Sequence, residues 1–115
     1  MKTLPIWRDA NCLLVETEQA VKHFPRYHKY TLGTELRTQV MLICRLINRA
    51  WRDKIKAQYY LEKLIASVDD VKIQLQLAKE LKVFRNFAEF ERLVVLIMAI
   101  GKQAAGWLKA IKAKA

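Results

Sequence analysis

The sequence predicts an all-α fold, an antiparallel four-helix bundle with up-down-up-down connections. Apolar residues recur at intervals of three and four along most of the 115 residues, and no segment shows the alternation of a strand. Pro25 and an Asn-x-x-Glu start signal at Asn86 divide this pattern into helices joined by short connections. Short connections place successive helices side by side and antiparallel. A chain of this length forms one domain around a single core.

The N-terminal part is expected to consist of an arm followed by the first helix. Residues 1–8 are few and include Pro5, so they are assigned to the arm, and residues 9–115 are assigned to the bundle domain. Asp9 is expected to cap the first helix, because a carboxylate accepts hydrogen bonds from the free N–H groups of a first turn. This helix should end close to Pro25, since proline disfavours the α region for the residue that precedes it.

The connection around residues 25–31 is basic and aromatic. Thr31 is expected to begin the second helix, with its hydroxyl accepting a hydrogen bond from a backbone N–H of the new first turn. Before it, basic side chains alternate with aromatic rings: Arg26, His28 and Lys29 with Tyr27 and Tyr30. Cations neutralise phosphates and rings stack on unpaired bases, so this corner is a candidate nucleic-acid contact. A tightly packed corner with half-buried tyrosines is the alternative.

The second helix is expected over residues 32–56, with an apolar arc on one side and a stripe of cations on the other. The centre of the arc is formed by Leu36, Val40, Ile43, Ile47 and Ala50. The stripe consists of Arg45, Arg49, Arg52 and Lys56, which lie within about 60° of one another at the helical period. Like charges on one face repel, so the stripe favours an anionic partner. An exposed polar face that happens to be basic is the alternative.

A third helix is expected over residues 57–83, and a fourth after Asn86. Asn86 and Glu89 have the spacing of a capping box. The centre of the fourth helix, residues 93–100, is apolar in every direction, and such a helix must be covered on two sides. In a small domain the expected cover is a second subunit. The expected contacts with that subunit are Val95, Met98, Ala99 and Gly106.

Charge is the strongest feature of the composition. The chain has 21 Lys and Arg against 11 Asp and Glu, a formal net charge of +10. This excess attracts polyanions, namely nucleic acid, an anionic membrane surface or an acidic protein. No secretion leader is recognised, and the longest apolar run is far shorter than the ~20 residues of a spanning helix, so no membrane insertion is expected. Cys12 and Cys44 lack the spacing of a disulfide framework or zinc site and fit a reducing cytoplasm.

Motifs of catalysis and metal binding are absent from the sequence. There is no Gly-rich phosphate loop, no Gly-x-Ser-x-Gly and no His-Glu-x-x-His. Asp69 and Asp70 are adjacent on a helix, where neighbours diverge by about 100°, so they do not form a catalytic or metal pair. We therefore expect no catalytic residue, no metal and no cofactor, and the protein is expected not to be an enzyme.

Several segments resemble a known family. They are Phe24-Pro25-Arg26-Tyr27-His28-Lys29-Tyr30-Thr31-Leu32-Gly33, then Leu75-Gln76-Leu77-Ala78-Lys79-Glu80-Leu81, Ile100-Gly101 and Gly106-Trp107-Leu108-Lys109. Together they resemble the four-helix family that includes the accessory variability determinant (Avd) of diversity-generating retroelements and the large-subunit rRNA intervening-sequence proteins. Ala105 departs from the family pattern, because many relatives have a glycine there.

The resemblance implies a basic, barrel-shaped homopentamer without a cofactor. An Avd-like protein is expected to be cytoplasmic, encoded by a bacterium or a phage, and to associate with a reverse transcriptase and with template RNA or its RNA/DNA hybrid. Its implied role is to support mutagenic retrohoming. The role of the intervening-sequence branch is much less defined, and the shared fold does not decide between the two branches.

The first hypothesis is thus a non-enzymatic, oligomeric accessory protein that binds nucleic acid beside a reverse transcriptase. The cations expected to contact phosphates are Arg26, Lys29, Arg37, Arg45, Arg49, Arg52 and Lys56. The second hypothesis is an intervening-sequence-type protein or an interaction scaffold whose basic face binds an acidic protein. Attachment to a membrane surface is disfavoured, because the apolar arcs are needed for the core.

Overall fold

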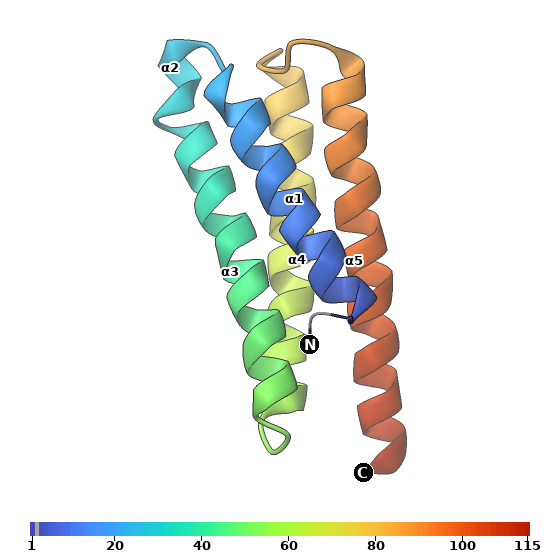
Figure 1. Cartoon of the computed structure of the whole chain (residues 1–115). Coiled ribbons are helices and arrows are strands. Elements are labelled where there is room, and N and C mark those ends of the chain that lie inside the picture. Colours follow the sequence, from blue (N-terminus) through green and yellow to red (C-terminus); the bar gives the residue numbers. More distant parts are fainter. Residues whose placement is uncertain (2) are drawn as a thin grey trace.

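The computed structural model describes residues 1 and 3–115, and these form the predicted four-helix bundle (Figure 1). The helices are α1 (Pro5–Lys22), the single-turn α2 (Arg26–Lys29), α3 (Leu32–Arg52), α4 (Ala57–Glu80) and α5 (Phe87–Lys114). The four long helices alternate in direction, and each packs against two others, in the order α1, α3, α4, α5 around the bundle. The described part contains no strand, so the predicted all-α class is confirmed.

The core runs along the whole axis of the bundle, which measures 47 × 23 × 22 Å. The apolar arc predicted for the second helix is confirmed, since all five of its residues on α3 are fully buried: Leu36, Val40, Ile43, Ile47 and Ala50. The other long helices add Leu13 from α1, Leu64 from α4 and Ile97 from α5, all fully buried. Burial on this scale is the main stabilising term of the fold.

The first helix begins earlier than expected. It begins at Pro5, so the predicted arm of residues 1–8 contains the first turn of α1, and residue 2 of that arm lies outside the described residues. Proline suits this position because a first-turn N–H needs no helical partner. Asp9 is inside the helix and does not cap it, which corrects that prediction. Its carboxylate instead accepts a hydrogen bond of 2.8 Å from the Gln103 side chain of α5.

The corner between α1 and α3 also differs from expectation. Thr31 precedes α3, but its hydroxyl does not accept a backbone N–H. It donates to the carbonyl oxygens of Tyr27 and His28, at 3.3 and 3.4 Å, and so closes the turn of α2. Gly33 is buried against the end of α1, where an added Cβ would lie 2.7 Å from Val21 Cγ1. This corner is therefore closely packed at Gly33, but Tyr27 and Tyr30 are exposed, so the half-buried tyrosines of the alternative interpretation are not observed.

The connection from α3 to α4 is short and held by one carboxylate. The second helix ends at Arg52, four residues before the expected end at Lys56. Asp53 ends it, because its Oδ1 accepts hydrogen bonds from the backbone N–H groups of Ile55 and Lys56, at 3.1 and 3.0 Å. Lys56 is consequently the residue that precedes α4 and is not part of α3.

The start signal predicted at Asn86 is confirmed. Its side chain accepts a hydrogen bond of 2.9 Å from the backbone N–H of Glu89. Glu89 is 4% exposed and reaches back to accept from the backbone and the guanidinium of Arg85. Upstream, α4 ends with Lys82 in the left-handed region at φ 58°, and Val83 donates to Ala78 across the turn. This hydrogen bond is typical of a Schellman motif, in which glycine is the usual residue at the position of Lys82.

The last helix, α5, has apolar side chains on its outward side as well as on the side that packs in the bundle. Leu93, Ile97 and Ile100 are buried, whereas Val95 and Met98 are 61% and 50% exposed. By length and composition alone, α5 meets the criteria for a membrane span, criteria that a core helix of a soluble protein also meets. Val95 and Met98 belong to the outward side of α5 that was predicted to contact a second subunit.

Candidate nucleic-acid interface

The four cations of the predicted stripe lie in the second half of α3 and in the connection that follows it. Arg45, Arg49 and Arg52 are on the outward side of α3, and Lys56 precedes α4. All four side chains are exposed, and none of them forms an ion pair with any residue that the structure describes. Exposed cations without a counter-charge retain their full attraction for an anion.

The other three predicted cations lie at the opposite end of the bundle. Arg26 and Lys29 belong to α2, and Arg37 lies near the start of α3. The guanidinium of Arg37 is 2.6 Å from the Glu18 carboxylate of α1, so its charge is already paired. A hollow of about 300 Å³ brings Lys29 and Arg37 together with Lys22 and Glu18. The seven cations therefore form two separate groups.

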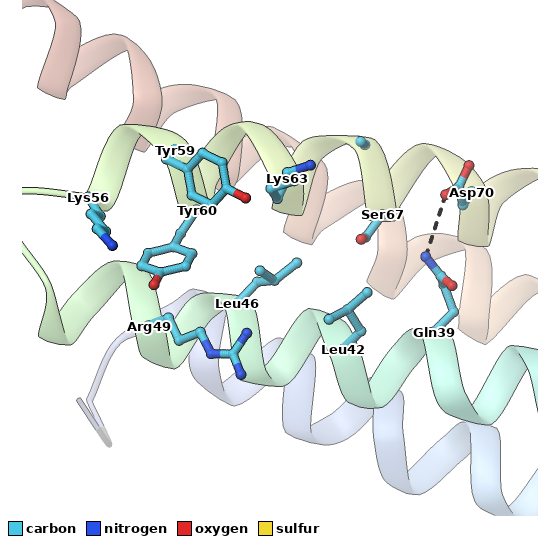
Figure 2. A pocket seen from close by; sticks show the side chains of 11 residues that line it. Gln39, Leu42, Leu46, Arg49, Lys56, Tyr59, Tyr60, Lys63, Ser67 and Asp70 are labelled. Carbon is cyan, nitrogen blue, oxygen red and sulfur yellow. Dashed lines mark hydrogen bonds between the residues drawn. The ribbon is translucent and has the colours of Figure 1, made fainter.

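A groove of about 900 Å³ between α3 and α4 adjoins the stripe (Figure 2). Its cations come from both helices, with Arg49 on one wall and Lys56 and Lys63 on the other. The residues that line it are Gln39, Leu42, Leu46, Arg49, Lys56, Tyr59, Tyr60, Lys63, Ala66, Ser67 and Asp70. Two cations of the stripe, Arg49 and Lys56, thus line this groove. The other two, Arg45 and Arg52, do not.

The groove changes in chemical character along its length. At the cationic end, the rings of Tyr59 and Tyr60 meet edge to face, 5.4 Å between centroids, and the Lys63 ammonium lies 5.5 Å from the Tyr59 centroid. At the far end, the Gln39 amide donates to Asp70 across the groove at 3.5 Å (Figure 2). Between these ends, leucine side chains of α3 form an apolar floor (Figure 2). One end can thus bind an anion, and the other can bind a hydrogen-bond donor.

The α3–α4 connection and the C-terminus lie at the same end of the bundle (Figure 1). Two contacts between helices lie near the middle of the bundle axis and divide the bundle into two halves. The Gln39 side chain of α3 donates a hydrogen bond to Asp70 of α4, and Gly101 of α5 packs against Val68 of α4. The half with the α3–α4 connection comprises residues 3–10, 40–69 and 102–115.

Charge is distributed unequally between the two halves. The half with the α3–α4 connection contains 11 Lys and Arg against 4 Asp and Glu. The other half, residues 11–39 and 70–101, contains 9 against 7. The excess positive charge is therefore concentrated around the stripe and the groove.

Sequence reasoning missed Tyr59, Tyr60 and Lys63. A signal was present, because Lys56, Tyr59, Tyr60 and Lys63 are spaced at i, i+3, i+4 and i+7 and so share one side of α4. The short connection from α3 makes the two helices antiparallel neighbours. This side of α4 therefore faces the last turns of α3, next to Arg49.

The residues predicted to contact a second subunit lie on the outward side of α5. Val95 lines a hollow between α1 and α5, and Met98 lines another between α4 and α5. Ala99 is half-buried. Gly106 is exposed, and an added Cβ there would have no atom within 4 Å. The residues that the structure describes cover this part of α5 only partly.

No family model matches the sequence, and no curated protein matches it. The likeness to the Avd family therefore depends on the sequence segments described above.

Among the described residues, no three His, Cys, Asp or Glu side chains are grouped so that they could hold a metal ion. The two cysteines are separate and free, with Cys12 exposed and Cys44 buried. Burial raises the pKa of the Cys44 thiol, so this group is neutral at pH 7.

Proposed function

We propose that this protein is a basic, non-enzymatic accessory protein that binds the phosphate backbone of RNA or of an RNA/DNA hybrid. The observation that carries the proposal is the group of exposed, unpaired cations at one end of the bundle, Arg45, Arg49, Arg52 and Lys56. Contacts of this kind neutralise phosphates without reading the sequence of bases. By its resemblance to Avd, the proposed partner is the reverse transcriptase of a diversity-generating retroelement, and the proposed role is support of mutagenic retrohoming.

Self-association into a ring, with five subunits by the same resemblance, is part of the proposal. What supports it is the uncovered apolar side of α5, where Val95 and Met98 are exposed. A ring repeats each cationic group once per subunit, so modest single-site affinity becomes avidity.

The nucleic-acid part is tested by measuring RNA binding against salt concentration. The variant Arg45→Glu/Arg49→Glu/Arg52→Glu removes three cations of the stripe. For single-stranded RNA the slope of log K against log salt is about −0.7 per neutralised phosphate, so it should become shallower by about 2. Fluorescence anisotropy of a labelled single strand measures both the affinity and the slope.

A matched control separates the stripe from overall charge. Lys22→Glu/Lys72→Glu/Lys82→Glu changes the net charge by the same amount, at exposed positions in the other half of the bundle. It should keep most of the affinity and of the slope. Equal losses in the two variants, or a salt-insensitive complex, would refute the assignment to the stripe.

The assembly is tested by light scattering of the purified protein. Val95→Glu/Met98→Glu should lower the mass of the assembly to that of one subunit, because it places charges in an apolar contact. If the unaltered protein already has the mass of a single subunit, the proposal that it forms a ring is wrong.

The polymerase partner is tested by co-purification with the reverse transcriptase of a diversity-generating retroelement. A complex that depends on the stripe and persists after nuclease treatment supports direct contact between the two proteins. Retention of an unrelated acidic protein, with no affinity for RNA, would favour the scaffold hypothesis instead. A gene located inside an rRNA gene would favour the intervening-sequence branch.

A further inference from the structure

We propose that the groove between α3 and α4 holds unpaired bases, so that the nucleic acid is bound as a single strand in preference to a duplex. This inference rests on the proposed function, and it adds the form of the nucleic acid and the residues that select it.

The shape of the groove fits a base better than a duplex. Backbone contact alone requires only exposed cations, which Arg45 and Arg52 already provide outside the groove. The groove adds an apolar floor of Leu42 and Leu46 within a concave space of about 900 Å³. An A-form duplex keeps the faces of its bases stacked inside and offers phosphates, hydroxyls and base edges. Only an unpaired base has an apolar face to place on this floor.

Two aromatic rings stand where the strand would enter. Tyr59 lines the groove and is 56% exposed, so much of its ring is accessible to a ligand. Tyr60 is half-buried and lies between α4 and Arg49 of α3 (Figure 2). Proteins commonly bind single-stranded nucleic acid with aromatic side chains next to cations, because every base has a flat face that can stack on an aromatic ring. The exposed ring of Tyr59 is thus the main stacking residue.

The two ends of the groove define how a strand lies in it. From Lys56 to Asp70 the chain advances about 21 Å at 1.5 Å per helical residue, which accommodates a short run of nucleotides. Phosphates bind at the cationic end near Arg49, whereas the carboxylate of Asp70 repels them from the far end. An exocyclic amine can donate to Asp70, and cytosine and adenine have one, whereas the N–H donor of an unpaired uracil base is its ring N3–H alone. The Gln39 contact that occupies Asp70 is long, 3.5 Å, and is readily exchanged for such a donor.

The test compares short oligonucleotides of one length by fluorescence anisotropy at fixed salt: single-stranded oligo(A), oligo(C) and oligo(U), and an RNA duplex. The unaltered protein should bind the single strands more tightly than the duplex. Tyr59→Ala should weaken single-strand binding by roughly 5- to 140-fold, the range measured for loss of one base–ring stack. It should leave duplex affinity and the salt slope nearly unchanged, since no phosphate contact is lost.

Two control variants separate stacking from other effects. Tyr59→Phe keeps the ring and should restore single-strand affinity. Phe87→Ala removes an aromatic ring that is 60% exposed at the opposite end of the bundle, and it should have no effect. Thermal unfolding followed by circular dichroism checks that each variant is folded, and exposed positions such as these are expected to tolerate the change.

The variant Asp70→Ala tests the far end of the groove. Loss of a negative charge raises the affinity for every oligonucleotide, so the informative quantity is the ratio of affinities for oligo(C) and oligo(U). This ratio should exceed one in the unaltered protein and approach one in the variant. An unchanged ratio overturns the role of Asp70.

The outcomes distinguish this inference from the function on which it rests. Salt-dependent RNA binding with equal affinity for duplex and single strand, insensitive to Tyr59→Ala, overturns the groove and leaves the proposed function intact. Absence of salt-dependent binding to any nucleic acid overturns both. Binding of polyglutamate that is as tight as that of RNA and equally sensitive to Tyr59→Ala also overturns the inference, because polyglutamate has no base to stack.

Discussion

Gly33→Ala and Gly106→Ala are expected to change stability in opposite directions. Each replaces a helical glycine, and alanine is favoured over glycine in a helix interior by about 1 kcal/mol. At Gly106 the added Cβ meets no atom within 4 Å, so the full gain is expected for the isolated subunit. At Gly33 the Cβ would lie 2.7 Å from Val21 Cγ1 and 3.4 Å from Phe24 Cδ2, so a buried side chain must move.

The expected magnitude follows from the difference between the two variants. Overpacking of a filled core costs about 1–3 kcal/mol, and Gly33, as the second residue of α3, gains no more helix propensity from alanine than Gly106 does in the interior of α5. Gly33→Ala should therefore be less stable than Gly106→Ala by about 1–3 kcal/mol. For a domain of this size, about 1 kcal/mol corresponds to a change in Tm of roughly 4 °C.

Urea unfolding followed by circular dichroism at 222 nm measures this difference, provided that the m-values agree. Measurement over a range of protein concentrations separates subunit stability from assembly. If the two variants have the same free energy of unfolding, the close contact between the start of α3 and the end of α1 is refuted. If Gly106 lies in a subunit contact, Gly106→Ala lowers the assembled fraction in light scattering while it stabilises the separate subunit.

Three further changes test local features of the fold. Lys82→Gly should raise the free energy of unfolding by about 0.5–1 kcal/mol in urea titrations, because Lys82 has a positive φ that glycine adopts freely. Asn86→Ala should lower it by about 1 kcal/mol in the same assay, whereas Asn86→Asp should retain most of the cap. Thiol titration with a maleimide should label Cys12 rapidly and Cys44 only after unfolding, since Cys44 is buried and has a raised pKa. Because that pKa is higher in the folded state, the contribution of Cys44 to stability is constant below the ordinary pKa of a thiol and falls as the pH rises above it, so the alkaline loss of stability should be smaller in Cys44→Ala.

The helices and their buried sides could be predicted because they depend on local periodicity. The arc centred on Ile43 is buried as its spacing required, and the cap at Asn86 is formed by the two residues that signalled it. The errors occurred where one residue type has two uses. Pro5 was interpreted as part of a non-helical arm although proline is also tolerated in a first turn. Thr31 was expected to accept a hydrogen bond, but a hydroxyl also donates.

The candidate site was only half visible in the sequence, because the groove belongs to a pair of helices. Periodicity placed Arg45, Arg49 and Arg52 on one side of α3, which required information from one helix alone. The groove also requires Tyr59 and Lys63 of α4, and their position relative to α3 depends on the register between two helices. Register is fixed by core packing and by the Asp53 turn, and neither is a property of a single helix.

The unequal charge of the two halves has a consequence for how the molecule meets its partners. With 11 cations against 4 acids in one half and 9 against 7 in the other, the bundle has a permanent electric moment along its 47 Å axis. A long-range field of this kind rotates a protein during its diffusional encounter with a polyanion, so that the positive end arrives first. If subunits associate around an axis parallel to the bundle, their positive ends gather on one rim, and the assembly has one face that attracts polyanions and one that is nearly neutral.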